Sequence, residues 1–308
     1  MSVRIKHFNF MLPMRKHAFT GIHKRMISVI LIVLITVLVA LYVGWPTVMA
    51  LSAIMPDGTL IEKAPNRFQE ITLTARDEVH LAAWYSEPEN GVAVILVHGA
   101  GSGRESVRSY ATMLQSNGFG VLALSLRGYS GSEGRINRLG WNSTQDIGAA
   151  VEYLLAQDEV KAVGGLGLSM GGEVLLGAAS QCPEIQAIAA DGATFRDVDE
   201  YMALPTNQPL YRNFTHRVFT LMLRLFSGDQ PPEVTIPESI RDAEITSFLF
   251  IAAGSDEAEI SFNEMFNRTA ADRSSLWIIP DVGHTGGYGR YPEEYEQRVV
   301  DFFSRLLG

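Results

Sequence analysis

The sequence predicts an α/β domain built on a mostly parallel central sheet with helices on both faces, preceded by one N-terminal transmembrane helix. Two observations predict it. Short, wholly apolar runs alternate with helical segments between residues 92 and 307, and an uncharged run of twenty residues lies near the N-terminus. Runs that are apolar at every position, rather than at alternate positions, indicate strands buried on both faces.

The uncharged run covers residues 26–45. A helix of this length spans roughly 30 Å, enough to cross the hydrocarbon core of a bilayer. Lys24 and Arg25 precede it directly, and no Lys or Arg follows until Lys63. The positive-inside rule therefore predicts a basic cytoplasmic tail at 1–25, an uncleaved signal-anchor at 26–45 and an extracytoplasmic remainder. Small residues at 48–53 leave open a cleaved signal peptide and a secreted protein.

Charge and cysteine content exclude several classes of protein. The first 50 residues carry six basic residues and no acid, whereas residues 51–308 carry 19 basic and 34 acidic residues. A polyanion would be repelled by this acidic body, so we expect no nucleic-acid partner. Cys182 is the only cysteine, which excludes a disulfide framework and a thiolate zinc site. The seven histidines lack HExxH spacing, and we expect neither a metal nor a cofactor.

After a linker at 46–67, the catalytic domain is predicted at 68–308, opening with a hairpin at 68–74 and 79–85. Further strands are predicted at 92–99, 120–126, 162–169, 185–192, 247–254 and 275–283, and helices at 104–117, 143–157, 170–180 and 292–307. One interval, about 195–245, is too long for a plain connection. It contains five prolines around a helical patch at 217–226, which predicts an inserted helical cap.

Ser169 lies in the run Gly-Leu-Ser-Met-Gly, residues 167–171, directly after an apolar strand and at the start of a helix. This context is typical of a nucleophile on a sharp strand-to-helix turn. Side chains two residues to either side would collide with the neighbouring chain, which explains the glycines. We therefore predict that Ser169 is a nucleophile exposed at the carboxyl edge of the sheet.

A serine hydroxyl needs a base, and His284 follows the last predicted strand, where its imidazole could reach Ser169. Asp256, after the penultimate strand, is predicted to hold the imidazole, because the order Ser, Asp, His and the strand position both fit. Three carboxylates compete with it: Glu257, Glu259 and Asp191.

The developing oxyanion needs backbone donors. We expect one from the N–H of Met170, the residue after the nucleophile, and one from the N–H of Ala100 in the glycine-rich loop at 98–103. His98 ends a buried strand, so we interpret it as a support of that loop rather than a base. Arg127, in the loop at 127–134, is interpreted as a structural residue in an ion pair.

In this order, the segments HGAGSG, LRGYSGSEG, GLSMGG, AAGSDE and DVGH resemble the α/β-hydrolase superfamily from about Phe68 to Leu307. The N-terminal membrane segment, the stretch RGYSGSEG and residues 192–195 are similar to the Bem46-like group and to bacterial hydrolases of the serine aminopeptidase type. One departure is Ser125, where members usually carry Asp. The resemblance implies Ser169 as nucleophile, Asp256 as acid, His284 as base, and no cofactor.

We expect a serine hydrolase that cleaves carboxylic esters or thioesters through an acyl-enzyme, acting on a small or lipid-like acyl substrate. A serine aminopeptidase-type peptidase is the alternative, with Glu173, Asp199 or Glu200 as candidates to bind the substrate ammonium. A catalytically inactive binding protein of the same fold is a third. Apolar cap residues could line an acyl pocket or simply dock the cap; they are Val218, Phe219, Leu221, Met222, Leu223 and Phe226. The sequence leaves the oligomeric state open.

Overall fold

The computed structural model describes residues 17–56, 61–204 and 210–308, and the chain divides into two compact units, Met1–Trp45 and Pro46–Gly308. Most of the predicted basic tail, residues 1–16, lies outside the described residues, as do residues 57–60 of the predicted linker and 205–209 of the predicted cap.

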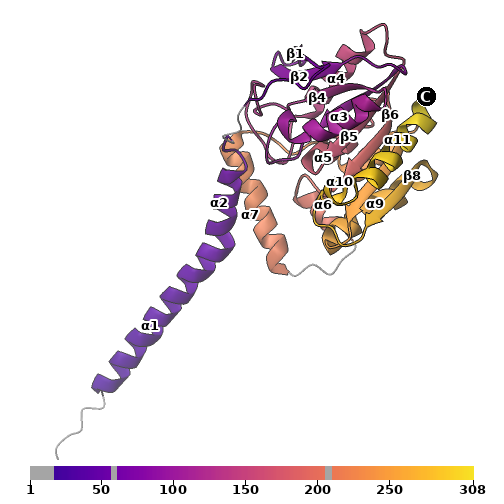
Figure 1. Cartoon of the computed structure of the whole chain (residues 1–308). Helices are drawn as coiled ribbons and strands as arrows, with labels where there is room; N and C mark the ends of the chain where they lie inside the picture. The colour runs from indigo at the N-terminus through magenta and orange to yellow at the C-terminus, as the bar shows by residue number, and fades with distance from the viewer. Residues whose placement is uncertain (1–16, 57–60, 205–209) are drawn as a thin grey trace, which may run out of the picture. The chain divides into compact units, whose positions relative to one another are not determined.

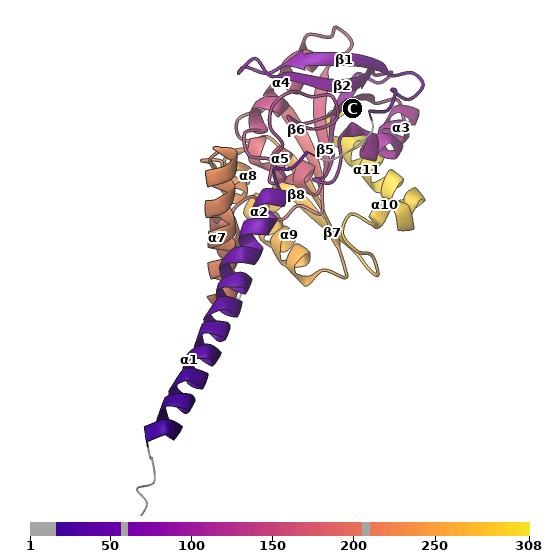
Figure 2. The ribbon, with the colours of Figure 1, turned by 90° about the vertical axis from the view of Figure 1, so that its left-hand side faces the viewer.

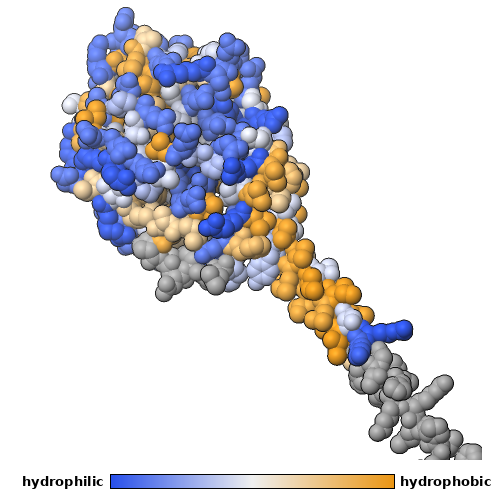
Figure 3. All heavy atoms as spheres, turned by 180° about the vertical axis from the view of Figure 1, so that it is seen from behind, coloured by the Kyte–Doolittle hydropathy of each residue, from blue (hydrophilic) through white to orange (hydrophobic). Residues whose placement is uncertain are grey.

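The described part of the first unit is helical, and the helix runs on into the start of the second. Helix α1, His17–Val39, continues through a π-helical turn, Ala40–Gly44, into α2, Trp45–Ser52. Within the described part of the chain, one helix, Lys24–Ser52, is long and apolar enough to cross a membrane, and a signal sequence would pass the same test. Figure 3 shows its apolar side chains as a nearly continuous orange band. The segment is therefore a candidate membrane span or signal sequence.

The second unit is built on a sheet of eight strands in the order β1-β2-β4-β3-β5-β6-β7-β8. Strand β2 pairs antiparallel with both β1 and β4, and every other pairing is parallel. The strands are β1 Gln69–Thr74, β2 His80–Ser86, β3 Val92–Val97, β4 Gly120–Leu124, β5 Ala162–Leu168, β6 Ile185–Asp191, β7 Ser247–Ala253 and β8 Ser274–Ile279. The predicted opening hairpin and mostly parallel sheet are confirmed.

Helices cover both faces of this sheet (Figures 1 and 2). One face packs against α4 Thr144–Leu155, α5 Met170–Ala178, α8 Ile236–Asp242 and α9 Glu257–Ala270, and the other packs against α3 Arg108–Ser116 and α11 Pro292–Leu307. A short 3₁₀ turn, Arg104–Val107, precedes α3, and a short helix α10, Gly287–Arg290, precedes α11. All six residues of β3 are buried because both of its faces are covered.

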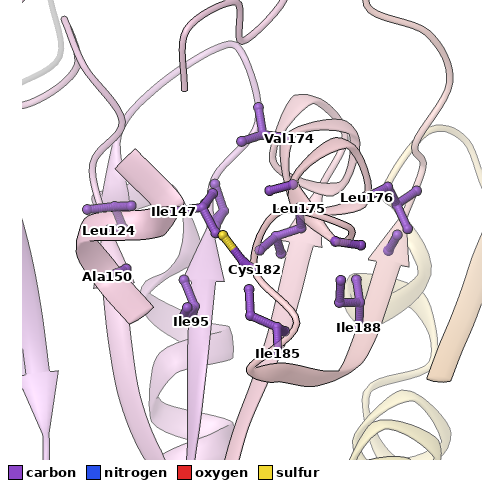
Figure 4. Close-up of a cluster of buried hydrophobic side chains, with 14 of the residues drawn as sticks. Ile95, Leu124, Ile147, Ala150, Val174, Leu175, Leu176, Cys182, Ile185 and Ile188 are labelled. Atoms are coloured by element: carbon purple, nitrogen blue, oxygen red, sulfur yellow. The ribbon is translucent and has the colours of Figure 1, made fainter. Parts of the chain in front are cut away.

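The larger core lies between the sheet and helices α4 and α5 (Figure 4). Ile95 of β3 and Ile188 of β6 pack with Ile147 of α4 and Leu175 of α5. Burying each such side chain contributes about 1.5–3 kcal/mol. Cys182 belongs to the same cluster, and burial raises the pKa of its thiol to about 11. Its surroundings are those of a structural, unreactive cysteine.

Among its described residues, the segment between β6 and β7 contains three helices, of which α6 Val198–Met202 and α7 Leu210–Ser227 come before α8. The predicted helical patch at 217–226 is the second half of α7. Helix α8 packs on α5 and α9 and so belongs to the body of the domain. Helix α9, which directly follows β7, was not predicted, and it changes the interpretation of the site.

Candidate active site

Four neighbouring strands bring the candidate residues together. Strands β5, β6, β7 and β8 are consecutive in the sheet and parallel. Ser169 follows β5, Asp191 ends β6, Glu259 lies in the first turn after β7, and His284 follows β8. The carboxyl ends of parallel strands share one edge, so residues separated by more than a hundred positions meet there.

Ser169 forms the turn between β5 and α5, with φ 52° and ψ −121°. A non-glycine residue held in this region costs about 1–3 kcal/mol, which the surroundings must offset. Two backbone bonds hold it: Ser169 N–H donates to the Asp191 carbonyl over 2.7 Å, and its carbonyl accepts from Glu173 N–H over 3.0 Å. The hydroxyl is thereby fixed at the sheet edge.

The two glycines of the motif are required by close backbone contacts. A Cβ added to Gly167 would lie 2.4 Å from the carbonyl carbon of Gly171, and one added to Gly171 would lie 2.4 Å from the carbonyl oxygen of Val97. Backbone atoms cannot move aside as a flexible side chain can. The sequence suggested that larger side chains at these two positions would collide with neighbouring chain segments, and the structure shows those collisions.

A continuous hydrogen-bonded chain joins three side chains. His284 Nε2 lies 2.8 Å from Ser169 Oγ, and His284 Nδ1 lies 2.6 Å from Glu259 Oε2. The Glu259 side chain is only 1% exposed, and its Oε1 accepts the Ala253 N–H over 2.6 Å. The His284 side chain is 46% exposed, so one end of the chain is buried and the other is accessible to a substrate.

The structure corrects the prediction for the acidic residue. Asp256 does not bond to His284; its carboxylate caps the N-terminus of α9 by accepting from Ala258 N–H and Glu259 N–H, each over 3.0 Å. This places Glu259 three residues into the helix, facing the imidazole. An Asp followed three residues later by Glu is a helix N-terminus signal, and it could have predicted this arrangement from the sequence.

Buried acids shift the titration of the site. The Glu259 carboxylate, bonded to the imidazole, is the largest cause of the raised pKa of His284, while partial burial opposes it. Burial raises the pKa of Asp191 to about 7, although Tyr295 OH donates to its carboxyl over 2.9 Å. Burial likewise raises the pKa of Glu173 to about 7, opposed by hydrogen bonds from Thr194.

The loop after β3 lies against the nucleophile. A Cβ on Gly99 would sit 3.5 Å from Ser169 Cβ. His98 Nε2 accepts the Leu126 N–H over 3.1 Å, so its Nδ1 carries the proton and donates to the Gly99 carbonyl over 2.7 Å. Because a trans peptide directs its C=O and N–H oppositely, fixing the Gly99 carbonyl also fixes the direction of the Ala100 N–H. His98 thus supports the loop, as expected.

Met170 is the first residue of α5, and the first N–H groups of a helix have no acceptor within the helix. The Met170 N–H is therefore available to an acceptor outside the helix, and the role of the Met170 and Ala100 N–H groups as oxyanion donors stays a prediction. Arg138 and Tyr129 donate to the Ala100 carbonyl over 2.9 Å and 3.3 Å, which anchors the far side of the same loop.

Arg127 forms the ion pair expected of it. Its guanidinium contacts Asp146 over 2.6 Å and Asp77 over 2.7 Å, and Asp146 is fully buried. The ion pair ties the loop after β4 to α4. Arg127 therefore has a structural role.

The apolar cap residues do not act as one group. Leu223 is buried with Ala50, Ala53 and Trp141, and Phe219 and Met222 pack against this cluster. Leu221 and Phe226 are exposed and Val218 is half-buried. The buried members dock α7 onto α2 and the Trp141 loop, which favours docking over the acyl-pocket interpretation. Within residues 17–56, 61–204 and 210–308, no group of three His, Cys, Asp or Glu residues could hold a metal ion.

Comparison with known proteins agrees with this fold. A family model described as the Alpha/beta hydrolase family matches residues 94–301, so the chain belongs to that family. Among curated proteins, it is similar to the uncharacterized protein YfhR of Salmonella typhi. The two are 28% identical over 301 residues, which cover 92% of this chain and 98% of YfhR.

Solved structures share the fold at low identity. The Pyrococcus furiosus esterase Pf2001 has a TM-score of 0.66 at 21% identity, covering 83% of this chain and 99% of that one. The dienelactone hydrolase of Anabaena variabilis has a TM-score of 0.55 at 21% identity, covering 79% of this chain and all of that one. The family and these neighbours support an enzyme with hydrolase activity.

Proposed function

We propose that this protein is a serine hydrolase that cleaves carboxylic esters, or thioesters, through an acyl-enzyme intermediate. The supporting observation is the chain Ser169 Oγ to His284 Nε2 to Glu259 Oε2, with distances of 2.8 Å and 2.6 Å about the imidazole. A hydroxyl, a base and a buried acid in hydrogen-bond contact are the three parts that nucleophilic acyl transfer needs. No cofactor enters this mechanism.

In the proposed mechanism, His284 removes the proton from Ser169 as its oxygen attacks the substrate carbonyl. Glu259 keeps the Nδ1 proton facing away from Ser169 and stabilises the imidazolium that forms. The N–H groups of Met170 and Ala100 bind the oxyanion. His284 then protonates the leaving alcohol or thiol, and a water activated by the same imidazole releases the acid and restores Ser169.

An ester is favoured over a peptide by the state of the acidic residues. A peptidase that binds an N-terminal ammonium needs an available carboxylate near the nucleophile. Glu173 is buried and accepts from Thr194 N–H and Oγ1, and Glu200 is buried in an ion pair with Arg196. Neither is placed to receive a charged substrate, whereas Asp199, the third candidate, is exposed and is the acid on which the peptidase alternative depends. The Bem46-like assignment stays a prediction, as does the inactive alternative, which a complete set of three residues disfavours.

For location, we propose that residues 26–45 stay uncleaved as an anchor, with residues 1–25 in the cytoplasm and residues 68–308 on the other side of the membrane. The charge asymmetry supports this orientation, since Lys24 and Arg25 flank only one end of the apolar helix. A substrate of small acyl or lipid-like character fits this location.

The test compares hydrolysis of p-nitrophenyl acyl esters with hydrolysis of aminoacyl nitroanilides by the full-length protein in detergent. We expect turnover of the esters and its loss in Ser169→Ala. Turnover of the anilides alone would establish the peptidase alternative instead. Folded protein that turns over neither substrate and does not react with a fluorophosphonate would contradict the proposed hydrolase.

A further inference from the structure

Helix α7 carries an exposed apolar face that the packing of the domain does not use. The α7 stripe consists of Tyr211, Val218, Leu221 and Leu225. At about 100° per residue these positions fall within an arc of about 80° on one side of the helix. Leu225 is 66% exposed, and Tyr211 and Leu221 are each at least half exposed.

The opposite side of α7 already has its packing partners. Leu223 is buried against Ala50 and Trp141, and the ring of His216 lies 4.0 Å from that of Tyr201. His216 also contacts Phe195, in the segment that follows β6. The stripe therefore lies on the side of α7 opposite these contacts.

The charge of α7 differs from that of the rest of the domain. Residues 51–308 carry a net charge of −15, yet Leu210–Ser227 contains no acidic residue. Arg217 and Arg224 are exposed and, on a helical projection, border the stripe. An apolar stripe bordered by arginines is the pattern of a helix that lies in the interface of an anionic membrane.

The chain itself brings α7 close to a candidate membrane span. Lys24–Ser52 is that span, and its last turns form α2. Ala50 of α2 packs with Leu223 of α7 within the second unit. The point where the apolar segment enters the domain is therefore in direct contact with the helix that carries the stripe.

We propose that the α7 stripe docks onto the lipid surface of the membrane that holds the N-terminal segment. Apolar side chains of the stripe enter the boundary between headgroups and acyl chains, and Arg217 and Arg224 bind anionic headgroups. The inference is independent of the ester chemistry, because it rests on the surface of α7 and on the N-terminal segment.

The test uses full-length protein reconstituted into vesicles of phosphatidylcholine with phosphatidylglycerol. A nitroxide is attached to Leu225→Cys, and its collisions with oxygen, which partitions into lipid, are compared with those of a water-soluble nickel chelate. The matched control is Ile245→Cys, which replaces an apolar residue of nearly the same exposure, 65%, at the amino edge of the sheet. Cys182 is buried and stays in place, and unsubstituted protein supplies the labelling background.

We expect oxygen collisions at 225 to exceed nickel collisions severalfold, and the reverse at 245. Removing phosphatidylglycerol, or substituting Arg217→Gln with Arg224→Gln, should lower the ratio at 225. Equal accessibility to the chelate at 225 and 245 would overturn the proposal. Protection of position 225 from both reagents would also overturn it, in favour of a contact with a second copy of the chain. If the ratio of oxygen to nickel collisions at 225 changed neither without phosphatidylglycerol nor in the double arginine variant, the proposed role of the arginines would be contradicted.

Discussion

Glu259 Oε2 lies 2.6 Å from His284 Nδ1, while Asp256, three residues earlier, caps the helix that positions Glu259. The two carboxylates are close in sequence and have different roles. One is buried and directed at the imidazole, and the other holds the backbone of the first turn of α9. This division of roles allows the acid of the site to be tested against a control within the same turn.

Glu259→Gln should lower kcat for an ester by between about 10² and 10⁴-fold with little change in KM. In the variant, the side-chain carbonyl oxygen of Gln must accept the Ala253 N–H, as Glu259 Oε1 does in the wild type. The amide NH₂ group then faces His284 Nδ1 and favours the tautomer whose proton is on Nε2, which cannot accept the proton of Ser169. Asp256→Asn, which keeps a good helix cap, should retain near-normal activity. Steady-state kinetics on both variants checks this; a larger loss in Asp256→Asn would restore the aspartate as the acid.

The pH dependence of the reaction should follow His284. Its pKa is raised above 6.5 chiefly by Glu259, and only the neutral imidazole can accept a proton from Ser169. For an uncharged ester, kcat/KM should therefore rise with pH through the raised pKa, and in Glu259→Gln the midpoint should move down. Profiles from about pH 5 to about pH 9 measure both midpoints. An unchanged midpoint in the variant would contradict the coupling.

The His284–Glu259 pair also makes the free energy of unfolding depend on pH. Its contribution to stability falls as pH rises, whereas kcat/KM rises. Because the folded pKa of His284 is raised, the contribution of the pair is fully present below the unfolded value near 6.5. It is lost as pH rises through the folded value.

Asp191 should make the folded state less stable as pH rises. Its pKa is raised by burial from an ordinary 3.8 to about 7, so the unfolded chain releases this proton at lower pH than the folded chain. The free energy of unfolding should decline by a few kcal/mol from about pH 4 to about pH 7 on this account. Asp191→Asn should flatten the decline, measured by urea denaturation, whereas the exposed control Asp272→Asn should keep it. If the free energy of unfolding fell with pH equally in wild type and in Asp191→Asn, the decline would not come from Asp191.

The glycine at 171 should not tolerate a methyl group. Gly171→Ala places a carbon 2.4 Å from the Val97 carbonyl oxygen and 2.6 Å from that of His98. We therefore expect the free energy of unfolding to fall by roughly 2–4 kcal/mol, and activity to be lost as well. Gly148 in α4 has nothing within 4 Å of an added Cβ. Gly148→Ala should instead stabilise by up to about 1 kcal/mol. Thermal unfolding of the two variants gives the comparison, and similar shifts for both would argue against the tight turn.

His98 should affect kcat rather than KM. His98→Ala removes the donor to the Gly99 carbonyl and so frees the direction of the Ala100 N–H. Because one oxyanion donor is worth about 10² to 10³ in kcat, partial loss of its orientation should cost up to about 10²-fold. Kinetics on variant protein whose unfolding curve is near normal provides the check. A rise in KM with unchanged kcat would assign His98 to substrate binding instead.

Much of the fold was predictable because its strands are buried on both faces. The apolar runs at 92–97, 162–168 and 247–253 could be recognised without knowledge of their neighbours. The last strand was predicted too long: it ends at Ile279, since Pro280 cannot donate to a sheet ladder and Asp281 has φ 56°. His284 is therefore on a loop of its own rather than at a strand end.

The acid of the site was harder to predict, for a geometric reason. Chain order favoured the first carboxylate after β7, but the direction of a side chain depends on where the next helix begins. Because α9 begins at Glu257, the third residue after β7, Asp256, caps the helix, and Glu259, one turn later, faces His284. The exposed stripe of α7 was likewise not predictable, because the apolar pattern alone does not show which face is covered.

The most direct test of the account is the site of covalent modification by a fluorophosphonate. Full-length protein is treated with the reagent and digested, and the modified peptide is identified by mass spectrometry. We predict one adduct, on Ser169, formed at least about 10²-fold more slowly in His284→Ala, because the hydroxyl then has no base. An adduct on another residue, or equal labelling rates in wild type and His284→Ala, would contradict it.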